Sequence, residues 1–71
     1  MKTVVLAKRY TEAVSNAAVQ EVVASKAHYG CQHAIVVTNS TFTASARELA
    51  ASNGVALWDR QKLDDLIRMY L

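Results

Sequence analysis

The sequence lacks several features that would place it in a specialised class of protein. It has one cysteine, Cys31, so no intrachain disulfide can form, which agrees with a reducing compartment. Apolar runs such as residues 4–7 and 34–37 are four residues each, whereas a membrane helix requires roughly 18. The opening Met1-Lys2 leads through a short apolar run to further charges, unlike a secretory signal peptide. We therefore expect a cytoplasmic protein with no membrane segment.

Charge is also scarce. Charged residues make up 20% of the 71 residues and the net charge is +2, which by itself does not indicate a nucleic-acid binder, because such proteins usually carry a basic patch. The hydrophobic content of 52% argues against disorder. A chain of this length forms one small domain that buries only about 60% of its unfolded surface.

The hydrophobic pattern predicts three strands alternating with three helices. Residues 4–7, 34–37 and 55–58 (VVLA, AIVV and VALW) are short apolar runs, typical of buried strands. Between and after them, apolar side chains recur every third or fourth residue, as on one face of a helix. The residues that predict helix starts are Ser15 or Asn16, Thr43 and Asp59, and those that predict helix ends are Gly30 and Asn53-Gly54.

This order predicts an α/β fold, a small β-α-β-α-β-α unit with a three-stranded, mostly parallel sheet in the order 1-2-3. The first two helices then share one face of the sheet. All three strands are apolar on both sides, so the second face also needs a cover. The last helix could fold across it, but at about 11 residues, or roughly 16 Å, it is a thin cover. We therefore expect a homodimer that pairs through the free edge of the first strand or through the uncovered sheet face.

Polar residues follow the first two predicted strands. Because parallel strands gather their carboxyl ends at one edge, where ligands usually bind, these residues should lie together. A helix that starts at Thr43 would add backbone N–H groups able to receive a phosphate. The alternative is an ordinary solvated lysine beside a simple turn. The residues expected at this edge are Lys8, Arg9, Thr38, Asn39 and Ser40.

Several ordered segments resemble the catalytic domain of Mrr-type restriction endonucleases, a branch of the PD-(D/E)xK nucleases. The resemblance implies a restriction-endonuclease-like fold, DNA as the substrate and cleavage with a divalent metal. Lys8 matches the catalytic lysine of the family. The resemblance runs from about Thr3 to Leu66, and its segments are KRY at 8–10, VQEV at 19–22, YG at 29–30, VVTNSTFT at 36–43, ARELA at 46–50 and LWD at 57–59.

The chain departs from the family pattern at the metal-binding positions. That pattern has Gln or Glu two residues before the lysine, where this chain has Leu6, and an aspartate on an earlier strand. The resemblance thus implies one truncated domain over residues 1–71 that lacks the upstream strands. Mg²⁺, expected for the intact family, binds carboxylates, and leucine offers no oxygen. Glu12 or Glu21 could substitute, but Glu21 lies off the apolar face of its helix. We expect no metal site, no cofactor and impaired catalysis.

Two further groups have both a functional and a structural interpretation. His28, Cys31 and His33 are close enough in sequence to suggest a metal site, but structural zinc takes four ligands and no fourth candidate is near. A helix end and a loop explain them better. Tyr29 and Trp58 could stack on bases, or could be core edges or an oligomer contact.

Three hypotheses for function follow. The first is an Mrr-like restriction endonuclease domain, or a remnant of one, whose catalysis is impaired. The second is a non-catalytic module that keeps the nuclease fold and holds the DNA backbone through Lys8 and Arg9. The third is a structural oligomer without a ligand.

Overall fold

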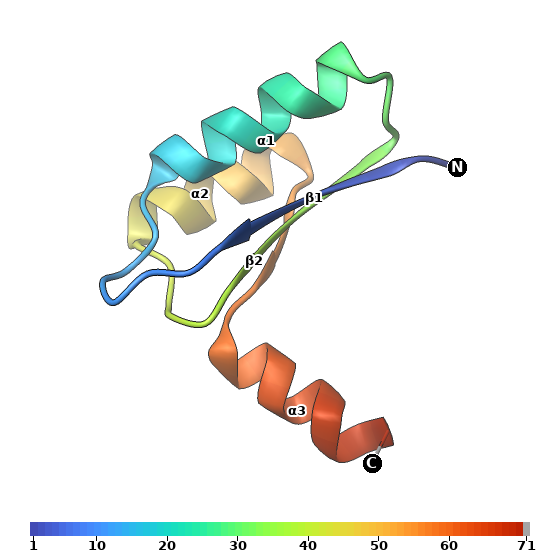
Figure 1. The fold of residues 1–71 in the computed structure, drawn as a ribbon. Coiled ribbons are helices and arrows are strands. Elements are labelled where there is room, and N and C mark those ends of the chain that lie inside the picture. The colour runs from blue at the N-terminus through green and yellow to red at the C-terminus, as the bar shows by residue number, and fades with distance from the viewer. Residues whose placement is uncertain (71) are drawn as a thin grey trace.

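The computed structural model describes residues 1–70 and has the predicted alternation of strands and helices (Figure 1). The first two strands are one residue longer at each end than the apolar runs, because Thr3 pairs with His33 and Lys8 pairs with Thr38. The elements are β1 (Thr3–Lys8), α1 (Asn16–His28), β2 (His33–Thr38), α2 (Ala44–Asn53), β3 (Ala56–Trp58) and α3 (Arg60–Tyr70).

The three strands form one parallel sheet in the order β1-β2-β3, as predicted. Leu6 of β1 lies beside Val36 of β2, and Val36 lies beside Leu57 of β3. The third strand begins one residue later than expected because the backbone N–H of Val55 donates to the carbonyl of Ala50 at 2.9 Å, which closes the turn after α2.

Helices α1 and α2 cover the same face of the sheet, which confirms the predicted arrangement (Figure 1). Strand residues alternate in direction, so every second side chain of β1 and β2 points toward these helices. Leu6 and Leu57 pack against the core from the sheet side. The buried apolar residues of the core are Val14, Ala18, Val19, Val22, Ala34, Val36, Phe42, Ala46, Ala50 and Val55.

The predicted helix boundaries have the expected local chemistry. Thr43 caps α2, with its Oγ1 accepting a hydrogen bond from the backbone N–H of Ala46 at 3.1 Å. Asp59 caps α3, with its Oδ1 accepting from the N–H of Lys62 at 2.8 Å. Gly30 and Gly54 follow the first two helices with φ values of 62° and 66°, a conformation that glycine adopts without strain.

Within residues 1–70, no other element covers the second face of the sheet. Helix α3 leaves the end of β3 and extends away from α1 and α2 (Figure 1). None of the residues Arg60–Tyr70 is buried. Among residues 1–70, no helix combines the length and the apolar character needed to cross a membrane. The sheet therefore has one packed face and one open face.

Candidate nucleic-acid interface

The carboxyl ends of β1 and β2 meet at one edge of the sheet and line a shallow hollow. Parallel pairing sets Lys8 directly beside Thr38. The hollow has a volume of about 390 Å³ and is bounded on one side by Leu63 from the first turn of α3. We call it the strand-end hollow; its lining residues are Ala7, Lys8, Arg9, Val37, Thr38, Asn39 and Leu63.

Lys8 projects from the covered face of the sheet. It lies two residues after Leu6, whose side chain packs against the core, so both side chains point to the same side of β1. The Lys8 Nζ is 3.1 Å from Oε2 of Glu21 on α1 and 6.0 Å from the centre of the Tyr10 ring. The hydrogen bond to Glu21 and its negative charge raise the pKa of Lys8 above the ordinary value of a lysine. The amine therefore stays an ammonium at neutral pH.

Glu21 is the residue at this edge whose place the sequence pattern did not reveal. Because it lies off the buried face of α1, sequence reasoning gave it little weight as a substitute acid. Helix α1 follows β1 through a tight reversal, so its amino-terminal half passes over the carboxyl end of the strand (Figure 1). An exposed position on the second turn of α1 is thereby close enough to pair with Lys8. The position of Glu21 near Lys8 therefore follows from the path of the β1–α1 connection and not from the spacing of apolar residues along α1.

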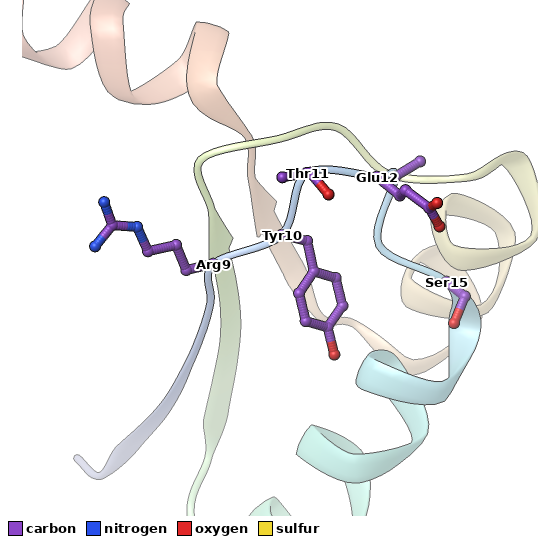
Figure 2. A pocket seen from close by; sticks show the side chains of 6 residues that line it. Arg9, Tyr10, Thr11, Glu12 and Ser15 are labelled. Atoms are coloured by element: carbon purple, nitrogen blue, oxygen red, sulfur yellow. The ribbon is translucent and has the colours of Figure 1, made fainter.

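Glu12, the other acid considered as a substitute, lies in a second hollow next to the first. This hollow has a volume of about 540 Å³ and is open to solvent beyond the end of β1 (Figure 2). In Figure 2 the Arg9 side chain extends in the opposite direction from Tyr10 and Glu12. Arg9 lines both hollows, is exposed and forms no ion pair within residues 1–70.

The Thr38-Asn39-Ser40 turn ties the two strand ends together. Asn39 Oδ1 accepts from the backbone N–H of Tyr10 at 3.0 Å, and Ser40 Oγ donates to the carbonyl of Glu12 at 2.9 Å. Thr38 is 1% exposed, and its Oγ1 accepts from the N–H of Ser40 at 3.2 Å. Thr38 therefore shapes the turn from inside, whereas Asn39 is exposed at the edge.

All five residues predicted at this edge are thus placed together. Lys8, Arg9, Thr38 and Asn39 line the strand-end hollow, and Ser40 is the next residue of the same turn. The cations supply positive charge, and the Asn39 amide supplies a neutral donor. This combination suits an anion such as a phosphate.

The donor set at this edge does not fit Mg²⁺. Leu6 occupies the strand position two residues before Lys8 and packs against the core. Glu21 is the carboxylate within 4 Å of the ammonium, and a metal ion at Glu21 would face that positive charge. Over residues 1–70, no three His, Cys, Asp or Glu side chains gather where they could hold a metal ion.

Of the other residues with two interpretations, Trp58 ends β3 beside Val37, and the rest lie away from this edge. His28 ends α1 and its ring meets the ring of Tyr29 edge-on, with centroids 4.7 Å apart. Cys31 is in the loop that follows, and His33 opens β2, where its Nε2 lies 2.9 Å from the sulfur of Met1. These residues occupy the amino-terminal end of the sheet, opposite the strand-end hollow.

Comparison with known proteins bears on the family of the chain. The model of the restriction endonuclease family, in its Mrr-type catalytic form, matches residues 1–67. No curated protein matches the chain, and no solved structure matches it. The family match covers almost the whole chain and includes β1, the strand-end turn and most of α3. The chain therefore belongs to the Mrr-type restriction endonuclease family.

Proposed function

We propose that the chain binds the DNA backbone at the strand-end hollow and does not cleave it. Membership of a restriction endonuclease family supports DNA as the partner. The observation that carries the proposal concerns two side chains on the same side of β1. The family's lysine is present as Lys8, whereas the metal-binding position is occupied by Leu6, which packs against the core. The amine that would contact a phosphate is present, and Leu6, two residues before it, offers no metal ligand.

The chemistry of hydrolysis explains why this loss matters. Cleaving a phosphodiester takes an activated water and stabilisation of the charge that develops on the phosphate and the leaving oxygen. Lys8 can stabilise that charge, and Arg9 and the Asn39 amide can hold the backbone. A metal ion supplies the activated water in the family, and this chain lacks the donor set for it. Binding without turnover is the outcome that these residues support.

The test measures binding of a short DNA duplex by fluorescence anisotropy over a series of salt concentrations. We expect binding at low salt that weakens steeply as salt rises, because phosphate contacts release counterions. Lys8→Gln should weaken binding and reduce the slope of log affinity against log salt by about 0.9, the value for one phosphate contact. Arg9→Gln should act in the same direction.

Lys26→Gln is the matched control, because Lys26 lies in the last turn of α1, at the far end of the helix from Glu21 and Lys8. It removes the same charge and should leave the slope unchanged. Equal losses from Lys8→Gln and Lys26→Gln would show that binding depends on net charge and not on the hollow. Plasmid cleavage in Mg²⁺ or Mn²⁺ that disappears in Lys8→Ala would overturn the claim of lost hydrolysis.

A further inference from the structure

The uncovered face of the sheet is apolar beyond its amino-terminal end, where Thr3 and His33 lie side by side. Val5 is 57% exposed on this face. The register of the sheet sets Ile35 between Val5 and Ala56, and Val37 between Ala7 and Trp58, so these side chains make two adjacent rows. A contiguous apolar patch of this kind marks an interaction surface. We call it the open sheet face; its residues are Val5, Ala7, Ile35, Val37, Ala56 and Trp58.

Helix α3 has an apolar stripe that is uncovered over its carboxyl-terminal half and partly buried at Leu63 and Leu66. Leu63, Leu66, Ile67 and Tyr70 follow helical spacing and lie on one side of the helix. Ile67 is 54% exposed and Tyr70 is 80% exposed. We call these four residues the α3 stripe. The chain therefore exposes one apolar sheet face and one apolar helix face, each of the kind that normally covers the other.

The α3 helix of the same chain is held away from its own open sheet face. A single residue, Asp59, joins β3 to α3, and its side chain caps the helix by accepting from the N–H of Lys62. The N–H of Arg60 donates to the carbonyl of Ser40 at 3.1 Å, and Arg47 lies 3.9 Å from the carboxylate of Asp59. Folding α3 back over the sheet would break the hydrogen bond between Arg60 and Ser40.

We propose that two copies of the chain form a symmetric dimer in which the α3 stripe of each covers the open sheet face of the other. A two-fold axis makes this exchange reciprocal, so both apolar surfaces of both copies are covered. An 11-residue helix is roughly 16 Å long, and a six-residue strand is about 20 Å long, so one helix spans most of the sheet. The inference does not rest on DNA binding, although Ala7, Val37 and Leu63 of these surfaces also line the strand-end hollow.

The two apolar surfaces present large side chains for a partner to cover. Val5, Ile67 and Tyr70 are each more than half exposed, and covering them takes their apolar area out of water. Because the open sheet face carries no charge, burying it leaves no ion without a partner. These features favour a second copy as the occupant.

The mass of the 71-residue chain in solution tests the proposal directly. Size-exclusion chromatography with light scattering at about 100 μM, a concentration that populates a dimer of micromolar Kd, should give twice the chain mass of 7.8 kDa. Ile67→Glu on the α3 stripe and Val5→Lys on the open sheet face should each give the monomer mass. Both sites are more than half exposed, so circular dichroism should show the secondary structure retained.

Gln61→Glu is the control, because it adds the same charge to α3 on the side of the helix away from the stripe, and it should remain dimeric. Mixing the Ile67→Glu and Val5→Lys chains should restore a heterodimer. In that pair one helix–sheet contact is entirely wild-type, and the other joins Glu to Lys. Formation of this heterodimer would distinguish exchange of α3 helices from a dimer that pairs through the β1 edges. A dimer of the second kind would still form in Ile67→Glu.

A wild-type chain that stays monomeric at this concentration would overturn the proposal. A dimer that survives both variants, or a mixture that shows no rescue, would do the same. Lys8→Gln should weaken DNA binding while leaving the dimer mass unchanged, so the failure of one proposal is distinguishable from the failure of the other.

Discussion

The alternation of side chains along β1 determines the surroundings of Leu6 and Lys8. Both side chains point to the covered side of β1, but Leu6 lies under α1 and packs in the core, whereas Lys8 emerges at the sheet edge beyond it. A carboxylate or amide at position 6 would have to reach the edge from within an apolar core, where an unpaired polar group is costly. Lys8 has no such conflict, since its long stem packs while its amine reaches Glu21.

Glu21 competes with a phosphate for the Lys8 ammonium. Its carboxylate oxygen is 3.1 Å from Nζ, the place where a phosphate oxygen would bind. Glu21→Gln removes that negative charge, and two unit charges about 4 Å apart in water interact by about 1 kcal/mol, so DNA affinity should rise roughly three- to fivefold. Fluorescence anisotropy at one low salt concentration measures the change.

Glu48→Gln serves as the control for Glu21→Gln, because it makes the same change in net charge on the exposed side of α2. It should raise affinity far less. A loss of affinity in Glu21→Gln would show instead that the carboxylate positions Lys8 for the phosphate, and the two residues would then act as a unit.

At the scale of single elements, the two helices that cover the sheet differ in how their first turns are capped. Thr43 satisfies a backbone N–H of α2 through its hydroxyl, whereas Ser15 stands at the start of α1 without a capping hydrogen bond from its side chain within the described residues. Thr43→Ala should therefore lower the free energy of unfolding by about 1 kcal/mol, the usual cost of removing a cap. Ser15→Ala should change it by much less. Urea unfolding followed by circular dichroism measures both, and equal losses would contradict this assignment.

Much of the fold was predictable because it depends on local patterns. Short apolar runs indicated the strands, and Gly30 and Gly54 indicated positions with positive φ. The parallel crossovers then placed Lys8 beside the Thr38 turn. These inferences need only neighbours in sequence and the handedness of the connections.

The parts that sequence reasoning did not locate depend on the relative placement of whole elements. The approach of Glu21 to Lys8 follows from how α1 crosses β1, which helix periodicity does not report. The direction of α3 depends on the hydrogen bond that the backbone N–H of Arg60 donates to the carbonyl of Ser40, and this contact is not visible as a pattern along the chain. Thr38 was expected at the surface of the site, but its position on the covered side of β2 buries its hydroxyl within the turn.

At the scale of the whole molecule, the fold is a sheet with one covered side. The core is built mainly from valine and alanine, with Phe42 as its one aromatic member among the buried residues described. A chain of this size buries a smaller fraction of its surface than a larger domain does and is marginally stable by itself. An open sheet face and an unpaired amphipathic helix add apolar surface in water. Dimerisation would remove that surface and stabilise the fold at the same time.

The stability of the chain should therefore depend on its concentration. If two copies cover each other, mass action favours the folded dimer, and a roughly twentyfold increase in protein concentration stabilises it by about 1.8 kcal/mol per dimer. The urea midpoint should rise accordingly between about 5 and 100 μM, where a dimer of micromolar Kd forms. Ile67→Glu should unfold at a lower midpoint that no longer changes with concentration, whereas Gln61→Glu should behave like the wild type. A wild-type midpoint that is the same at both concentrations would mean that the open sheet face is stable in water, and the explanation of this fold as half of a dimer would be wrong.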